Sequence, residues 1–325
     1  MSKPKVYVTR LIPDDGMKLL YDKCEVTVNP HDRVATRQEL IDNIKGKDAM
    51  LCLLTDTIDA EIMDANPNVK IIANYAVGFN NIDVQAATQR GIPVSNTPGV
   101  LTDTTADMAW TLIMSTARRV VEGDKFTRAG KYKGWGPLLL VGQDVHHKTL
   151  GIIGFGRIGQ TVAKRAAGFD MKILYYDVNK MPEVAQKYNA EYRELDDLLR
   201  ESDIISLHVD LNDSTRHLIS EREFGLMKDT AYLINTARGP VVDENALVQA
   251  LKNNRIAGAG LDVFENEPAL APGLAELDNI VIPPHIASAT RETRGAMARI
   301  AAENVIAALE GRKPPTIVNL EVWKD

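Results

Sequence analysis

A guanidinium, a carboxylate and an imidazole each follow a predicted strand in the second half of the chain. They belong to Arg238 in NTARGP, Glu267 in LDVFENEP and His285 in VIPPHIASAT. Histidine titrates in the range needed to give a proton to a developing alkoxide. A nearby carboxylate orients the ring and favours its protonated form, and an arginine can bind a substrate carboxylate through two parallel hydrogen bonds. The three groups together suit hydride transfer to the carbonyl of a small 2-oxo acid.

Each of these residues also has a plain structural interpretation when it is taken singly. Arg238 could be a surface cation in a turn, and Glu267 a solvated acid in a loop that also contains Glu265. His285 could be a core histidine whose hydrogen bonds are satisfied internally. The chemical interpretation therefore depends on the three residues meeting at one place.

A glycine-rich turn supplies a second chemical signal. Gly154, Gly156 and Gly159 have the spacing G-x-G-x-x-G, directly after the apolar stretch 150–153 and before a helical pattern. Such glycines allow a tight turn, close approach of backbone to a pyrophosphate and close helix–strand packing. The alternative is an ordinary tight turn in a βαβ unit.

The next predicted strand ends at an acid, Asp177, placed where a carboxylate would hold the ribose hydroxyls of a dinucleotide. A carboxylate there favours NAD over NADP, because it repels a 2′-phosphate. Asn179 and Lys180 follow at once, and a lysine in this loop could help to hold a phosphate, which leaves NADP open.

Short apolar strands alternate with helical patterns along almost the whole chain, which predicts an α/β fold with parallel sheets. We expect two Rossmann-like or flavodoxin-like domains with a cleft between them: a discontinuous domain, 1–100 plus 288–325, and a dinucleotide-binding domain, 101–287. One long helix is expected over 101–130, with Ala109, Leu112, Ile113 and Ala117 near one face. A terminal helix ending near Gly311 should carry the chain back to the first domain, with Met297, Ile300, Ala301, Val305 and Ala308 at helical spacing. In such sheets ligands bind beyond the carboxyl ends of the strands, so the polar loops and the glycine turn should share one crevice.

Composition excludes several other classes of function. The chain of 325 residues has a formal net charge of −6 and no dense Lys/Arg tract, so neither nucleic acid nor an anionic membrane is expected as a partner. The N-terminus shows no signal-peptide pattern, and no apolar run approaches the length of a membrane span. Cys24 and Cys52 lie in apolar strand-like surroundings, which is typical of free thiols in the cytoplasm. No metal site is predicted.

Six ordered motifs resemble the D-isomer-specific 2-hydroxyacid dehydrogenases, and the resemblance covers nearly the whole chain. The motifs are YAVGFNNID (75–83), TTADMAWTLIMSTAR (104–118), TLGIIGFGRIGQ (149–160), LINTARGPVVDENAL (233–247), GAGLDVFENEP (258–268) and PHIASAT (284–290). Within that family the sequence is most similar to the glyoxylate and hydroxypyruvate reductases. The resemblance implies reduction of glyoxylate or hydroxypyruvate to glycolate or D-glycerate.

The resemblance also assigns roles to individual residues. His285 would be the acid/base, Glu267 its partner and Arg238 the substrate-binding cation. Asp262 would face the nicotinamide amide. The implied cofactor contacts are Thr104, Gly154, Gly156, Arg157, Ile158, Gly159, Asp177, His208, Val209, Thr236, Ala237, Asp262, His285 and Ala287. The implied substrate contacts are Leu53, Val77, Gly78, Arg238, His285 and Ser288.

Some of these assignments have structural alternatives. The backbone N–H groups of Val77 and Gly78 would cradle the substrate carboxylate. Leu53 could equally be a core residue, and Ser288 could be the N-cap of the terminal helix. The chain departs from many relatives at Asp210, where they carry proline. This acid would further discourage a 2′-phosphate if it lay near the adenosine ribose, or it would simply face solvent.

Other functions remain open at this level. D-lactate dehydrogenase differs in pocket size, which the sequence does not determine, and a remote alternative is a nucleotide-sensing scaffold like the corepressors that share this fold. A homodimer is expected through residues 101–145, where Trp110, Trp135 and Leu138 to Leu140 would form the interface. The alternative for those side chains is packing within one chain.

Overall fold

The computed structural model describes residues 2–323 and divides into two compact units, 1–101 with 288–325 and 102–287. Each unit is an α/β layer structure in which helices cover both faces of a parallel sheet, as the alternation of strands and helices predicts. Among the described residues, no helix combines the length and the apolar character that crossing a membrane requires.

The first unit contains a five-stranded parallel sheet in the order β2-β1-β3-β4-β5. Its elements are β1 (Lys5–Val8), α1 (Asp14–Lys23), β2 (Glu25–Val28), α2 (Arg37–Ile44), β3 (Ala49–Cys52), α3 (Ala60–Asp64), β4 (Ile72–Asn74), α4 (Val84–Gln89), β5 (Val94–Ser95), α12 (Arg291–Leu309) and the 3₁₀ turn η4 (Leu320–Val322). Alternate side chains of β1 serve opposite faces, since Val6 and Val8 pack with α1 and α12 while Tyr7 packs with α2, α3 and α4. Both faces of this sheet are therefore buried.

The terminal helix α12 packs against α1 within this unit. A Cβ added at Gly16 would lie 2.4 Å from the carbonyl oxygen of Ala298, so the two helices approach as closely as glycine allows. Four of the five residues predicted to face inward, namely Met297, Ala301, Val305 and Ala308, are buried, and the fifth, Ile300, is half-buried. The helix α12 is thus part of the first unit's core.

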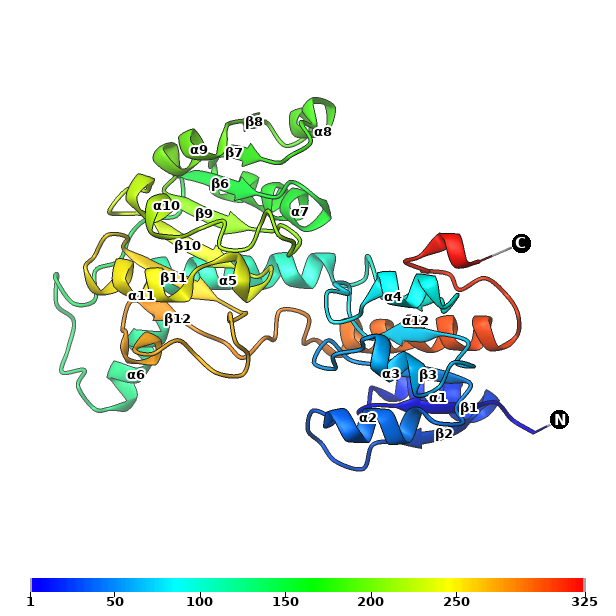
Figure 1. Cartoon of the computed structure of the whole chain (residues 1–325). Helices are drawn as coiled ribbons and strands as arrows, with labels where there is room; N and C mark the ends of the chain where they lie inside the picture. The colour runs from blue at the N-terminus through cyan, green and yellow to red at the C-terminus, as the bar shows by residue number, and fades with distance from the viewer. Residues whose placement is uncertain (1, 324–325) are drawn as a thin grey trace. The chain divides into compact units, whose positions relative to one another are not determined.

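The second unit contains a seven-stranded parallel sheet in the order β12-β11-β10-β9-β6-β7-β8, which Figure 1 shows as a continuous stack. Its elements are α5 (Thr102–Ala117), α6 (Val120–Arg128), β6 (Thr149–Ile153), α7 (Arg157–Ala166), η1 (Ala167–Phe169), β7 (Lys172–Tyr176), α8 (Pro182–Gln186), β8 (Ala190–Tyr192), α9 (Leu195–Glu201), β9 (Ile204–Leu207), α10 (Glu221–Leu226), β10 (Tyr232–Asn235), η2 (Gly239–Val241), α11 (Glu244–Lys252), β11 (Gly258–Leu261), η3 (Leu274–Glu276) and β12 (Ile280–Val281). One face is covered by α5 and α7, and the other by α9, α10 and α11.

The single long helix expected over 101–130 is wrong. The chain breaks at Arg119, whose φ of 52° is left-handed, and α6 starts afresh after it. The predicted face of α5 is confirmed, because Ala109, Leu112, Ile113 and Ala117 are all buried. Trp110 is buried too: its ring stacks on Phe169 and its Nε1 donates to the carbonyl of Val162 at 3.2 Å, so its packing is internal to the unit.

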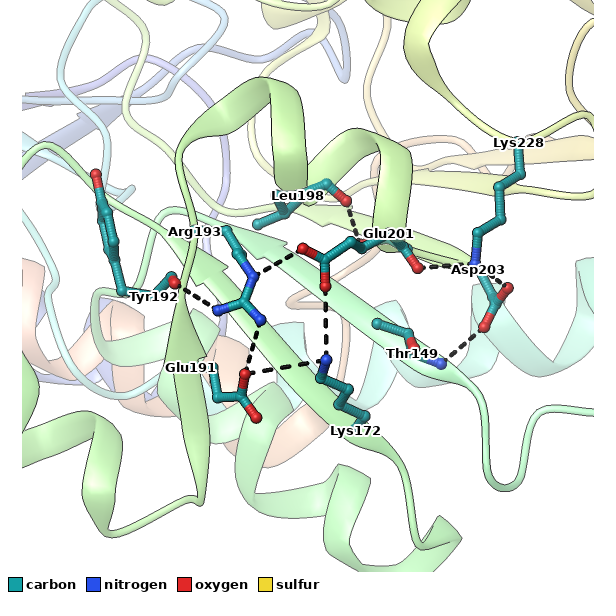
Figure 2. A network of polar contacts seen from close by, with 10 residues as sticks. Thr149, Lys172, Glu191, Tyr192, Arg193, Leu198, Glu201, Asp203 and Lys228 are labelled. Atoms are coloured by element: carbon teal, nitrogen blue, oxygen red, sulfur yellow. Dashed lines mark hydrogen bonds and ion pairs between the residues drawn. The ribbon is translucent and has the colours of Figure 1, made fainter.

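A network of charged side chains closes the amino-terminal edge of the second sheet (Figure 2). Asp203 accepts hydrogen bonds from the Nζ of Lys228 at 2.8 Å and from the backbone N–H of Thr149 at 2.9 Å. Burial alone would raise the pKa of Asp203, but these hydrogen bonds and the lysine charge outweigh burial and lower that pKa. Beside it, Glu201 pairs with Arg193 at 2.8 Å. This edge is structural, and the polar loops of chemical interest lie at the opposite, carboxyl-terminal edge.

Candidate active site

His285 and Glu267 form a hydrogen-bonded pair at the carboxyl-terminal edge of the second sheet. The Nδ1 atom of His285 lies 2.9 Å from Oε2 of Glu267. His285 follows β12 and the stiff pair Pro283–Pro284, and its own φ is 52°, a conformation that non-glycine residues rarely adopt. The side chains of His285 and Glu267 are 26% and 30% exposed, so both reach solvent. His285 is therefore not a core histidine, and Glu267 is not an unpaired solvated acid.

The environment of Glu267 keeps its carboxyl group ionised. Burial alone would raise the pKa of Glu267, but the hydrogen bond and charge of His285 outweigh burial and lower that pKa. Its other oxygen, Oε1, accepts the backbone N–H of Phe264 at 3.0 Å. One oxygen of Glu267 thus holds the loop and the other holds the imidazole.

Arg238 lies at the end of β10 in a loop held by Asn235. The Nδ2 of Asn235 donates to the carbonyl of Arg238 at 2.9 Å, and its Oδ1 accepts the N–H of Ala237 at 3.0 Å. Burial lowers the pKa of the Arg238 guanidinium, while the charges of Asp210 and Glu267 favour its charged form. Arg238 is thus a half-buried cation influenced by two acids rather than a surface charge, and Asp210, although exposed, acts on it.

The loop that carries Arg238 packs directly on the loop that carries Glu267. A Cβ added at Gly239 would lie 1.9 Å from the carbonyl group of Phe264, a distance that no side chain can occupy. The two loops follow adjacent strands, β10 and β11. This contact brings the guanidinium and the His285–Glu267 pair to one stretch of the sheet edge.

Asp262 is fully buried at the end of β11 and holds the segment after His285. Its two carboxylate oxygens accept the backbone N–H groups of Ile286 and Ala287, each at 2.8 Å. Burial is the largest influence on this carboxyl and raises its pKa. The family resemblance implies that Asp262 faces the nicotinamide amide, and the structure adds that its carboxylate is bonded to the backbone that follows the histidine.

The structure also decides which residue caps α12. The N-cap is Thr290, whose side chain accepts the N–H of Thr293, so the alternative interpretation of Ser288 as the N-cap is wrong. Ser288 instead offers its backbone carbonyl to the N–H of Thr290 at 2.9 Å and to Nε of Arg294 at 3.3 Å.

The glycine turn has the geometry that a dinucleotide requires. Gly154 has φ of +92°, and a Cβ there would lie 2.6 Å from the backbone of His208. A Cβ at Gly159 would lie 2.2 Å from the carbonyl oxygen of Gly154, whereas Gly156, the N-cap of α7, faces open space. Two glycines are thus needed for the turn itself, and the third leaves backbone accessible at a helix N-terminus, where phosphates bind.

The loop after β7 bears on which dinucleotide fits. The carboxylate of Asp177 accepts the N–H of Phe155 at 2.8 Å and that of Asn179 at 2.9 Å, which ties the acid to the glycine turn. The Nζ of Lys180 lies 4.3 Å from the centre of the Tyr192 ring and 3.6 Å from Glu194. The lysine charge is therefore engaged by an aromatic face and an acid of its own.

Among the buried polar atoms of the described residues that lack hydrogen-bond partners, two follow strands of the second sheet: Nδ1 of His208 after β9 and the hydroxyl of Thr236 after β10. The other ring nitrogen of His208 is 2.8 Å from the hydroxyl of Ser206. Burial lowers the pKa of His208 to about 3, so the ring is neutral at pH 7. Unsatisfied buried groups are uncommon, and these two, at the carboxyl ends of β9 and β10, fit a site that receives a polar ligand.

The remaining predicted contacts of the second unit lie on the same edge or in α5. Val209 and Ile158 are half-buried, Ala237 and Ala287 are buried, Arg157 is exposed at the start of α7, and Thr104 lies half-buried in the first turn of α5. In the part of the chain that the structure describes, no group of three or more His, Cys, Asp or Glu side chains could hold a metal ion.

In the first unit, the side chains of Asn74, Asn81 and Asn96 hold the loop 75–81. The carbonyl of Val77 accepts from Nδ2 of Asn96 at 2.7 Å, and that of Gly78 accepts from Nδ2 of Asn74 at 2.9 Å. No residue within 2–323 accepts a hydrogen bond from the N–H of Val77 or Gly78. Leu53 is half-buried and packs against the core of this unit, and its carbonyl accepts from Asn81.

Sequence reasoning missed the residues that hold these loops. Asn235 could have been noticed as an asparagine at a strand end next to Arg238. Glu244 accepts the N–H groups of Glu265 and Ala271 and so holds the loop that carries Glu267. The sequence did not indicate this role, because an acid in the first turn of a helix is normally exposed. Asn74 and Asn96 likewise became visible only when the loops were placed.

Comparison with known proteins gives the family. Residues 110–287 match the model of the D-isomer specific 2-hydroxyacid dehydrogenase, NAD binding domain. A glyoxylate reductase of Thermofilum pendens is 54% identical over 329 residues, covering 100% of this chain and 97% of the relative. The chain belongs to the D-isomer-specific 2-hydroxyacid dehydrogenases and is an NAD(P)-dependent oxidoreductase.

Solved structures agree with this assignment. A glyoxylate reductase from Paecilomyes thermophila has a TM-score of 0.87 at 35% identity, covering 99% of this chain and 100% of that one. An NADPH-dependent glyoxylate/hydroxypyruvate reductase from Sinorhizobium meliloti, solved with NADP and malonate, has a TM-score of 0.88 at 30% identity, covering 100% and 99%. The predicted α/β fold with two parallel sheets is confirmed.

Proposed function

We propose that the protein reduces a small 2-oxo acid, glyoxylate or hydroxypyruvate, to glycolate or D-glycerate with NADH. The observation that carries this proposal is the joint placement of Arg238 and the His285–Glu267 pair on the sheet edge that also carries the glycine turn. The relatives named as glyoxylate reductases support the choice of substrate.

The residues of the second unit divide the chemistry among them. The turn Gly154 to Gly159 would hold the pyrophosphate of NADH, and the bound dinucleotide would supply the hydride. Arg238 binds the substrate carboxylate and polarises the adjacent keto oxygen. His285 gives its proton to that oxygen as charge develops on it, and Glu267 stabilises the imidazolium and fixes its orientation.

The remaining assignments are parts of the same proposal. The N–H groups of Val77 and Gly78 contact the substrate carboxylate, and their carbonyls are already engaged by asparagines, which fixes the direction of the peptide groups. Leu53 and Ser288 line the substrate site. The unit formed by 1–101 and 288–325 thus binds substrate, while 102–287 binds the dinucleotide.

NADH is the proposed cofactor rather than NADPH. Asp177 places a carboxylate next to the glycine turn, and Lys180 is paired with Glu194 and Tyr192. A 2′-phosphate would therefore meet the negative charge of Asp177, and the nearby Lys180 would not be available to neutralise it. The Sinorhizobium meliloti relative shows that NADP binds elsewhere in the family, so the choice depends on these side chains.

A cytoplasmic homodimer is also proposed, with the segment 101–145 as its interface. Trp135, Leu138 and Val141 are 84%, 87% and 61% exposed, and α6 has no buried residue. Such a group of apolar side chains on one segment is typical of a protein–protein contact. Light scattering should give twice the monomer mass of 35.8 kDa, and a monomer would refute this part of the proposal.

The experiment that tests the function is steady-state oxidation of NADH and NADPH with a panel of 2-oxo acids. Glyoxylate and hydroxypyruvate should give the highest kcat/KM, with NADH preferred. Pyruvate as the best substrate would indicate a D-lactate dehydrogenase instead. The absence of oxidation with every acid across physiological pH would favour the nucleotide-sensing scaffold.

A further inference from the structure

Glu244 is a buried carboxylate that forms no ion pair with any residue of the described range 2–323. It is the first residue of α11 and only 2% exposed. Acids are seldom buried unless they are paired, because leaving water costs free energy. An acid at a helix N-terminus interacts favourably with the helix dipole even when the acid is exposed. The helix start therefore does not explain why Glu244 is buried, and α11 is already capped by Asp243.

The partners of Glu244 are two backbone N–H groups of one loop. Its Oε1 accepts the N–H of Glu265 at 2.6 Å, and its Oε2 accepts the N–H of Ala271 at 3.2 Å. The segment 264–271 between these bonds contains Glu267, the partner of His285. A single carboxylate therefore fixes both ends of the loop that presents Glu267.

A second set of contacts fixes the same loop from outside. The side chain of Glu265 accepts the N–H of Glu244 at 3.3 Å and lies 2.6 Å from Nε2 of His217. Glu265 and Glu244 thus exchange backbone and side-chain hydrogen bonds in both directions. Several hydrogen bonds, rather than a single contact, therefore hold the loop in place.

The carboxylates of Glu244, Glu265 and Glu267 lie close together, and their mutual repulsion destabilises the fold. Burial raises the pKa of Glu244, and the charges of Glu265 and Glu267 raise it further against the two N–H bonds. A neutral acceptor at this position would avoid the repulsion. The carboxylate is the only common side chain with two acceptor oxygens and no donor, which is what two inward-pointing N–H groups require.

We propose that Glu244 is a positioning residue for the reaction: by bonding the N–H groups of Glu265 and Ala271, it holds Glu267 at hydrogen-bonding distance from Nδ1 of His285. This inference rests on the proposed role of the pair in proton transfer. Glu244 positions Glu267 through the loop, and the charged groups near Glu267 are His285, Arg238, Asp262 and Glu244 itself.

The test compares Glu244→Gln and Glu244→Ala with Glu221→Gln as a matched control. Glu221 is also the first residue of a helix, α10, but it is exposed. With glyoxylate, kcat should fall about tenfold in Glu244→Gln and about a hundredfold in Glu244→Ala, because a misplaced pair transfers the proton less well. The dissociation constant of NADH should change by less than about twofold, since the glycine turn is untouched.

Two readouts separate positioning from a general loss of structure. The pH at which kcat declines on the alkaline side should move lower in Glu244→Gln, because imidazolium loses its carboxylate partner. The NMR signal of the His285 imidazole should also change, because its Nδ1 loses the carboxylate partner. Unchanged kcat, an unchanged pH profile and an unchanged His285 signal in both variants, as in Glu221→Gln, would overturn the proposal.

A measurement on the unaltered protein covers the case in which the variants do not fold. The amide protons of Glu265 and Ala271 should exchange with solvent more slowly than that of Asn266 in the same loop. Equal exchange would show that Glu244 does not hold them and would overturn the proposal. If the wild-type protein reduces no 2-oxo acid, the proposed function fails, while the NMR signal of the His285 imidazole in the Glu244 variants still decides whether Glu244 positions the pair.

Discussion

Glu267 bonds to Nδ1 of His285, which leaves Nε2 as the ring atom that exchanges a proton with a ligand. The two atoms of the pair are 2.9 Å apart, and the pKa of Glu267 is held low by the imidazole, so the acid is ionised and accepts a hydrogen bond from Nδ1–H. With Nδ1–H committed to Glu267, the mobile proton of the imidazolium is on Nε2. Two features set the direction of the ring. They are the left-handed backbone at His285 and the two hydrogen bonds that Asp262 accepts from the N–H groups of Ile286 and Ala287.

Replacing Arg238 by lysine should reduce kcat/KM for glyoxylate about a hundredfold. Lysine keeps the charge but loses the planar fork that binds a carboxylate through two bonds. Steady-state kinetics with Arg216→Lys as control, an exposed arginine of the same unit, measures the effect. An unchanged kcat/KM in Arg238→Lys would refute its binding of the substrate carboxylate.

Alanine at two of the turn glycines should have different effects, one on stability and the other on NADH binding. Gly154→Ala should lower the free energy of unfolding by about 1–3 kcal/mol, because φ of +92° strains any side chain and its Cβ would meet His208. Gly156→Ala meets open space, so stability should stay within about 1 kcal/mol while the NADH dissociation constant rises about tenfold. Denaturant unfolding and NADH titration distinguish them, and equal losses of stability would contradict the assignment.

Asp177 should control the choice of dinucleotide, and Lys180 should not. Asp177→Asn removes the charge that repels a 2′-phosphate, so the ratio of kcat/KM for NADH over NADPH should fall about tenfold. Lys180→Ala should leave the ratio within about twofold, because the ammonium lies over the Tyr192 ring and beside Glu194. A large change with Lys180→Ala alone would assign the phosphate-side contact to the lysine.

The pair of Asp203 with Lys228 should make stability depend on pH (Figure 2). Because the folded pKa of Asp203 is lowered, its stabilisation is complete above the unfolded value of about 3.9 and is lost as the pH falls below it. Asp203→Asn should cost about 1–2 kcal/mol at pH 7. The difference from wild type should shrink below about pH 4.

Urea unfolding at several pH values measures this dependence, with Asp229→Asn as control. Asp229 is exposed and lies close in sequence to the same edge. A cost for Asp203→Asn that is the same at pH 7 and at low pH would show that the charge on Asp203 is not what stabilises the edge.

The strands and the chemical residues could be predicted from sequence because both have local signals. The stretches at 149–153, 172–176 and 204–207 are short apolar runs, and the structure places strands at each. Arg238, Glu267 and His285 follow three such strands, and parallel topology then brings their loops to one edge.

The remaining features depend on contacts that no local pattern encodes. The break at Arg119 occurs inside a continuous helical pattern, and only the left-handed φ reveals it. Glu244 has the sequence context of an exposed helix-start acid and becomes informative because the loop 264–271 folds over it. The two oxygens of Asp262 accept hydrogen bonds from backbone N–H groups 24 and 25 residues away, which no local sequence pattern encodes.

The most direct test of the central claim is single-turnover reduction of glyoxylate by wild type and His285→Ala at saturating NADH. The rate should fall about a thousandfold in His285→Ala, because the proton donor is gone, while the NADH dissociation constant stays within about twofold. His31→Ala, an exposed histidine of the other unit, should behave as wild type. A His285→Ala variant that reduces glyoxylate and hydroxypyruvate at the wild-type rate would contradict the claim that His285 donates the proton.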